Sequence, residues 1–96
     1  MAGPTIGVIL CANASATSLP VKFPGTRSCF VVNATTYPTT MNFQVQGPSG
    51  AWININAVTI SADGIYPYDI PAGLYRVFMS GGAPAGVYVN LVSVPY

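Results

Sequence analysis

The sequence predicts an all-β protein, a small antiparallel β-sandwich or barrel of about seven short strands in a jelly-roll-like or up-and-down arrangement. Short runs rich in Val, Ile, Phe, Tyr and Thr recur along the chain, and clusters of Gly, Pro, Asn and Ser separate them. No window shows apolar residues at helical spacing between capping residues. A chain of 96 residues is expected to fold as a single β domain, 1–96, around one modest core.

The expected strands begin and end near these turn residues. They are Gly7–Ala12, Ser28–Ala34, Thr40–Gln46, Trp52–Ile60, Gly64–Tyr68, Gly73–Ser80 and Gly86–Val94. In Thr40–Gln46, apolar and polar residues alternate, which places one set on the core face and the other toward solvent. The core set is Met41, Phe43 and Val45, and the solvent set is Asn42, Gln44 and Gln46.

Turn residues connect the strands of the C-terminal half. The turn Gly47–Gly50 predicts an antiparallel hairpin in which Ile53 and Ile55 of the second strand face inward. Asp63 and the glycine after it predict another tight turn, and Gly81–Ala85 joins the last two strands. These turns are consistent with an up-and-down order, although they do not exclude a Greek-key crossing earlier in the chain.

The N-terminal part, 1–26, is expected to form an arm or an edge strand. Pro20 and Pro24 flank Val21–Phe23, and proline cannot donate a hydrogen bond to a sheet, so Ser15–Thr26 is interpreted as an edge strand or a loop over the sheet. The apolar run before it resembles the centre of a secretory signal. It lacks a basic start and is short, so it is assigned to the first strand.

Ionisable side chains are rare in this chain. Charged residues make up 5% and apolar residues 51%, the net charge is +1, and neither His nor Glu occurs. Catalytic triads, zinc sites and phosphate-binding loops need residue types or spacings that are missing, so no enzymatic activity, cofactor or metal is expected. Scattered cations do not form a nucleic-acid surface, and no apolar run is long enough for a membrane helix.

The carboxylates and the cysteines have structural interpretations. Asp63 is expected to be a turn residue, and Asp69 to satisfy Arg76 or backbone amides, in preference to a calcium site shared by both carboxylates. Cys11 and Cys29 are interpreted as small buried residues in two apolar strands. A single disulfide between them is the alternative in an oxidising compartment.

Both faces of the last two strands are apolar. Leu74 and Phe78 lie opposite a core set on one strand, and Tyr88 and Val92 do so on the other. A small sandwich has one interior, so the second set must lie under a loop, against another subunit or in an exposed patch. Because monomers rarely leave large apolar patches uncovered, these four residues are the candidate subunit interface.

Aromatic residues support an alternative site. Trp52, Tyr66 and Tyr68 are candidates for a platform on which a sugar ring stacks, because aromatic side chains with polar groups are frequent at binding surfaces. Packing of these side chains in the core or at an interface is favoured over this interpretation.

The run from Asp63 to Val77 includes the step Pro71-Ala72-Gly73-Leu74-Tyr75-Arg76, and Trp52 precedes it after a Gly-Pro-Ser-Gly turn. With these features, roughly residues 50–96 resemble the C-terminal part of small β-rich virion proteins of tailed bacteriophages. That group includes capsid decoration (cement) proteins and head or tail fibre modules. The first half of the chain has no motif that matches it.

This resemblance implies a non-enzymatic structural protein that is made in the host cytoplasm and becomes part of the virion. Such proteins are typically homotrimers bound to the major capsid protein or another virion protein. The leading expectation is therefore a decoration subunit that stabilises an assembled shell through intersubunit contacts. The alternative is a carbohydrate- or receptor-binding module, or a tail fibre module, that uses Trp52 and exposed tyrosines.

Overall fold

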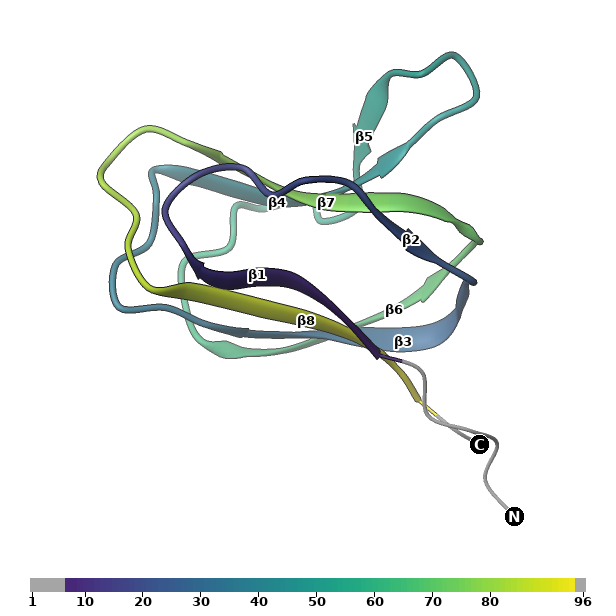
Figure 1. The fold of residues 1–96 in the computed structure, drawn as a ribbon, viewed down its shortest axis with the longest axis horizontal. Helices are drawn as coiled ribbons and strands as arrows, with labels where there is room; N and C mark the ends of the chain where they lie inside the picture. Colours follow the sequence, from purple (N-terminus) through teal and green to yellow (C-terminus); the bar gives the residue numbers. More distant parts are fainter. Residues whose placement is uncertain (1–6, 95–96) are drawn as a thin grey trace.

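The computed structural model describes residues 7–94, and this part of the chain forms eight strands and no helix. The strands are β1 (Gly7–Ala14), β2 (Val21–Phe23), β3 (Thr26–Asn33), β4 (Thr40–Gln46), β5 (Trp52–Asn54), β6 (Gly64–Ile70), β7 (Gly73–Ser80) and β8 (Val87–Ser93). They make two four-stranded antiparallel sheets that lie face to face (Figure 1). The predicted all-β sandwich is confirmed.

The order of the strands is that of a double-sheet jelly roll. Sheet 1 has the order β1-β8-β3-β6, and sheet 2 has the order β2-β7-β4-β5. Apart from β4 and β5, strands that follow one another in sequence lie in different sheets, as in jelly rolls. The up-and-down alternative is therefore wrong. Gly81–Ala85 does not make a hairpin but leads from β7 in sheet 2 to β8 in sheet 1.

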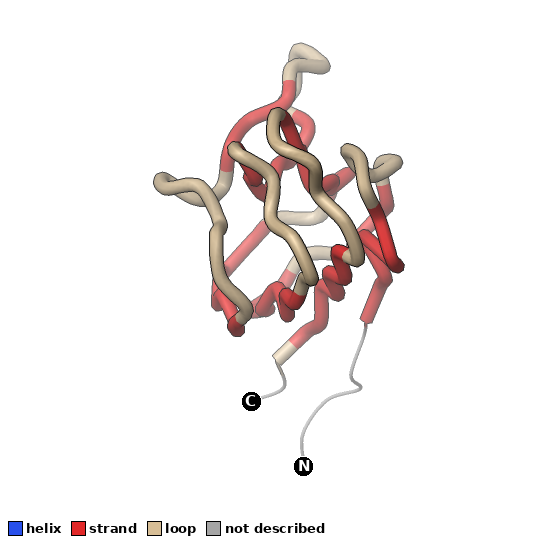
Figure 2. The backbone as a smooth tube through the Cα atoms, turned by 90° about the vertical axis from the view of Figure 1, so that its left-hand side faces the viewer, coloured by secondary structure: helices blue, strands red, loops and turns tan. Residues whose placement is uncertain are grey.

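Loops cover one end of the sandwich and run side by side there (Figure 2). Thr36 and Ala85 exchange backbone hydrogen bonds of 3.0 and 3.1 Å, which join the β3–β4 loop to the β7–β8 loop. Asp63, just before β6, accepts hydrogen bonds from the Ala34 amide and the Tyr37 hydroxyl. These bonds hold the pKa of the Asp63 carboxyl below its usual value, while burial and then this carboxylate raise the pKa of Tyr37.

Aromatic rings from both sheets meet in the core. Phe30 of β3 and Phe43 of β4 stack with their centroids 4.0 Å apart and their planes 4° from parallel. Tyr66 and Tyr68 of β6 meet this pair edge-on. The buried apolar side chains are Leu10, Cys11, Phe23, Phe30, Val32, Met41, Phe43, Ile60, Ile70, Tyr75, Val77, Met79, Val87, Val89 and Leu91. The inward positions predicted for Met41 and Phe43 are confirmed, and Val45 is half-buried.

The predicted strand Trp52–Ile60 is too long, because β5 ends at Asn54. Beyond it, the backbone amides of Ile55 and Ile60 still donate to β4, but side chains take over the acceptor role: the Asn56 Oδ1 accepts from the Phe43 amide at 2.7 Å. Such bonds from Asn compete with a regular ladder and let the chain leave the sheet. Ile53 does not face inward as predicted but is 51% exposed, since the β4–β5 hairpin projects from the sandwich (Figure 1).

The segment Ser15–Thr26 combines the two predicted forms. β2 is the edge strand of sheet 2 and pairs with β7. Before it, Thr17 and Ser18 lie along the same edge, where their hydroxyls accept from the Met79 and Val77 amides at 3.0 and 2.8 Å. Short strands and side-chain caps leave little of this edge for pairing with other chains. Of the predicted N-terminal arm, residues 1–6 lie outside the described part.

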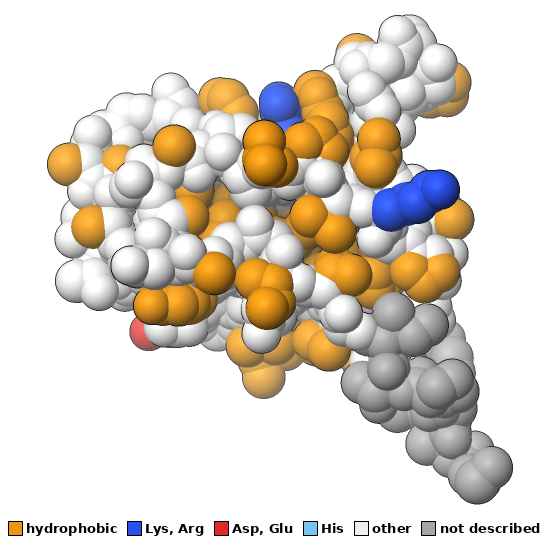
Figure 3. Space-filling model, viewed as in Figure 1, with side chains coloured by type: hydrophobic (Ala, Val, Ile, Leu, Met, Phe, Trp, Pro, Cys, Tyr) orange, Lys and Arg blue, Asp and Glu red, His pale blue; other side chains and the backbone are white. Residues whose placement is uncertain are grey.

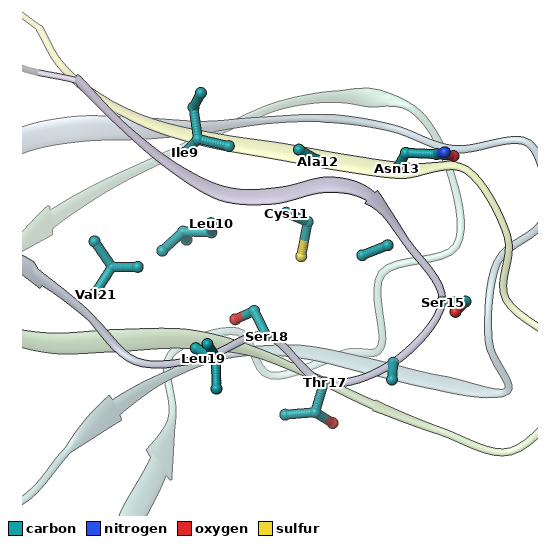
Figure 4. A pocket seen from close by; sticks show the side chains of 12 residues that line it. Ile9, Leu10, Cys11, Ala12, Asn13, Ser15, Thr17, Ser18, Leu19 and Val21 are labelled. Atoms are coloured by element: carbon teal, nitrogen blue, oxygen red, sulfur yellow. The ribbon is translucent and has the colours of Figure 1, made fainter.

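The cysteines are not bridged. Cys11 is buried on the inner side of β1 and Cys29 is half-buried on the outer side of β3, with β8 between the two strands. The thiol of Cys11 points toward Ser18, into the open hollow of about 550 Å³ between β1 and the following loop (Figure 4). Burial raises the pKa of Cys11 to about 11, and the hydrogen bond with Ser18 opposes this rise.

A thiol reagent is therefore expected to modify Cys29 quickly in the native protein and Cys11 only after unfolding. Cys11 is 3% exposed, and with a pKa of about 11 only about one thiol in a thousand is ionised at pH 8. Titration with a chromogenic disulfide in native and denaturing buffer measures both phases. Cys29→Ala should remove the fast phase and Cys11→Ala the slow one; equal rates for both thiols would contradict the assignment.

Candidate interaction surfaces

The outer side of sheet 1 carries apolar side chains on all four strands. The register aligns Ile9, Asn90, Val31 and Ile65 in one row across β1, β8, β3 and β6. A neighbouring row contains Val92, Cys29 and Pro67. Together with Tyr88, which lies opposite Asn33, these rows form what we call the apolar face: Ile9, Cys29, Val31, Ile65, Pro67, Tyr88 and Val92.

The apolar face is open to solvent in this structure. Ile9 is 64% exposed, Ile65 68%, Tyr88 45% and Val31 38%. The ionisable pair on this side of the sheet is Arg27 opposite Asp69, toward one end of β3 and β6. Figure 3, which looks at the edge of the sandwich formed by β1 and β2, also shows few charged side chains and widespread hydrophobic ones.

The predicted interface residues do not lie on one surface. Tyr88 and Val92 belong to the apolar face of sheet 1. Leu74 and Phe78 lie on the outer side of sheet 2, because the neighbouring residues of β7 fill the core. The prediction of a single face required β7 and β8 to be neighbours in one sheet, and the jelly-roll crossover places them in opposite sheets.

The outer side of sheet 2 carries a polar group of side chains around Arg76 of β7. The Arg76 Nε donates to the Gln44 Oε1 at 2.7 Å, and the Gln44 Nε2 donates to the Asn54 Oδ1 at 2.9 Å. The guanidinium carbon lies 4.3 Å from the centroid of the Trp52 ring. We call Arg76, Gln44, Asn54 and Trp52 the arginine cluster. It covers Gln44, which is 9% exposed although it was predicted to face solvent.

The predicted sugar-stacking platform is divided between two places. Trp52 belongs to the arginine cluster on the outer side of sheet 2. Tyr66 and Tyr68 point inward from β6, pack against Phe43, and line an open hollow of about 390 Å³ beside the loop 56–62. The Tyr66 hydroxyl donates to the Ala62 carbonyl at 2.6 Å. The two tyrosines therefore serve the core, and Trp52 is the one candidate left on an outer face.

The carboxylates are separated as well. Asp63 precedes β6 and Asp69 lies near its other end, so the extended strand keeps them about 20 Å apart. No group of three potential metal ligands among His, Cys, Asp and Glu occurs in residues 7–94. The pairing of Asp69 with Arg76 is wrong, since Asp69 lies in sheet 1 opposite Arg27.

Sequence reasoning missed part of both surfaces. Ile9, Val31 and Ile65 were placed on strands but not on a common face, because that requires the strand order of sheet 1. The available signal was in β3, where Cys29 and Val31 are apolar although Phe30 and Val32 already supply the core side of the strand. The partnership of Arg76 with Gln44 and Asn54 had no sequence signal, since these residues meet across three strands.

Within residues 7–94 no helix has the length and apolar character needed to cross a membrane. Comparison of the chain with protein-family models, with curated proteins and with solved structures found no match.

Proposed function

We propose that the protein is a non-enzymatic structural subunit of a virion, a capsid decoration (cement) protein whose apolar face packs against an apolar surface of the assembled shell. The observation that carries the proposal is the row Ile9, Val31 and Ile65, exposed across the width of sheet 1. Jelly rolls occur in viral capsid proteins and in lectins, so the fold alone does not decide the function. The resemblance of residues 50–96 to small virion proteins supports the choice.

The size of the apolar face favours a partner that offers several contacts at once. Four strands about 4.8 Å apart and rows about 7 Å apart give a surface on the order of 400 Å² when side-chain widths are included. Its burial contributes about 10 kcal/mol at 25 cal/mol per Å². Association costs about 4–15 kcal/mol, so a single such contact is weak. An assembled shell presents repeated sites, and contacts made together on it bind far more tightly than one contact alone.

The test uses purified shells that lack the protein. Added wild-type protein is expected to sediment with them and to raise their rupture temperature, because a ligand of the assembled state stabilises that state by mass action. Ile65→Asp should weaken binding at least tenfold, since it places a charge in an apolar contact. Ile53→Asp is the matched control, because Ile53 is similarly exposed but lies on β5 of sheet 2.

Two results would count against the proposal. Shells whose rupture temperature does not change at saturating protein would exclude a cement function. Equal binding of Ile65→Asp and Ile53→Asp would show that the apolar face is not the contact. The homotrimer remains a prediction, which light scattering of the free protein measures directly; a mass of one or two subunits would contradict it.

A further inference from the structure

We propose that the arginine cluster on the outer side of sheet 2 binds a sugar that carries a carboxylate. This surface lies opposite the apolar face, so the two proposals rest on different residues and fail independently. Three features support the site. Arg76 is a cation without a carboxylate partner, the side-chain amides beside it have N–H groups that make no hydrogen bond within the cluster, and the ring of Trp52 lies next to them.

The charge of Arg76 has no counterion in the described part of the chain. Asp63 is held by Ala34 and Tyr37 at the loop-covered end, and Asp69 lies in sheet 1. The hydrogen bond of Arg76 to Gln44 uses the Nε, and within residues 7–94 the terminal nitrogens have no hydrogen bond. Those terminal N–H groups form the edge of a guanidinium that matches the two oxygens of a carboxylate.

The direction of the hydrogen bonds leaves further donors at the surface. A guanidinium can only donate, so Gln44 must turn its Oε1 to Arg76 and its Nε2 to Asn54. Asn54 then accepts with its Oδ1, which leaves its Nδ2 free to donate. In the same way the Asn56 Nδ2 donates to the Asn42 Oδ1 at 2.9 Å, and the amide nitrogen of Asn42 is left over. This surface therefore offers donors and suits a ligand rich in acceptor oxygens.

Aromatic rings fix the cation and favour a sugar as the ligand. The Arg76 guanidinium lies 4.3 Å from the centroid of Trp52 and 5.8 Å from that of Phe78. These rings restrict its motion, so less freedom is lost when it binds. Trp52 is half-buried and presents apolar surface next to the cation, where the C–H groups of a sugar ring can pack. Cross-strand spacings of about 5 Å place the amide donors within reach of ring hydroxyls.

The experiment titrates the protein with an oligomer of galacturonic acid and, separately, with its methyl ester, which has the same shape without the charge. Trp52 is the one tryptophan of the chain, so its fluorescence reports binding at this site. A saturable change is expected with the acid, and the ester should need at least a tenfold higher concentration. The affinity for the acid should fall as sodium chloride is added.

Substitutions separate this site from general charge effects. Arg76→Gln should abolish the saturable response, and Arg76→Lys should weaken it at least tenfold, because an ammonium group cannot make the paired contact. Arg27→Gln removes the same charge from the opposite sheet and should leave binding unchanged. Circular dichroism of each variant checks the fold, and the comparison of acid with ester in the wild type needs no variant.

Four outcomes of these binding experiments would overturn the proposal. These are the absence of a response to the acid, equal responses to acid and ester, and an equal loss in Arg27→Gln. The fourth is saturation by a glutamate-rich peptide at a lower concentration than by the sugar acid, which would make the cluster a contact for an acidic protein segment.

Discussion

Replacement of Gly25 by Ala is expected to lower the free energy of unfolding by about 2–5 kcal/mol, the sum of a backbone penalty and an overlap. Gly25 joins β2 to β3 with a φ of +80°, a conformation that disfavours residues with a Cβ. A Cβ there would lie 2.2 Å from the Ala72 amide nitrogen and 2.4 Å from the Pro71 carbonyl carbon. Both atoms are backbone, so no change of side-chain rotamer can relieve the overlap.

Gly50→Ala is the matched control for this substitution. Gly50 has a φ of +91°, but a Cβ at this position would meet nothing within 4 Å. Gly50→Ala should therefore lower the free energy of unfolding only by the cost of the backbone conformation, about 1–2 kcal/mol. Urea unfolding of the two variants and the wild type measures the difference. Equal losses would show that the β6–β7 turn moves aside and that the approach of Gly25 to Ala72 does not constrain the fold.

Local signals predicted the strands best where alternation and turn residues agree. The bounds predicted for β4 and β7 are those of the structure, since Gly and Pro lie close to both ends of each strand and β4 also alternates cleanly. β5 was overestimated because Asn56 continues the alternation in sequence while its side chain replaces a backbone partner of β4. A polar residue at an alternating position does not reveal which of these two roles it takes.

The order of the strands in each sheet could not be predicted from the sequence. Alternation divides each strand into two faces but does not say which strand lies beside it. For that reason Phe78 and Tyr88 were placed on one surface, although the crossover between β7 and β8 puts them on opposite sides of the sandwich. The same limit hid the row of Ile9, Val31 and Ile65, three residues on strands from distant parts of the chain that β8 and the sheet register bring into line.

The aromatic residues of the sequence likewise predicted only part of the arginine cluster. Trp52 was recognised as a candidate, but its partners are Arg76, Gln44 and Asn54 rather than Tyr66 and Tyr68. Tyrosines on an edge strand can face either way, and the inward direction of Tyr66 and Tyr68 follows from the stacked pair that they cover.

Phe43→Ala is expected to lower the free energy of unfolding by about 3–5 kcal/mol, the usual cost of removing a fully buried phenylalanine ring. The Phe43 side chain is 0% exposed and stacks on Phe30 of the facing sheet at 4.0 Å. Its removal leaves a cavity between the sheets and takes away the ring that Tyr66 and Tyr68 meet edge-on. Both the lost burial and the cavity contribute to this cost.

Phe78→Ala is the matched control, because the same ring is removed from the outer side of sheet 2. Phe78 is half-buried beside Arg76, so truncation leaves no internal cavity and should cost about 1 kcal/mol or less. Thermal and urea unfolding of both variants give the two values. If Phe78→Ala lowered the free energy of unfolding strongly and Phe43→Ala only slightly, the inner and outer faces assigned to β4 and β7 would have to be exchanged. The arginine cluster would then be part of the interior and not a surface for a ligand.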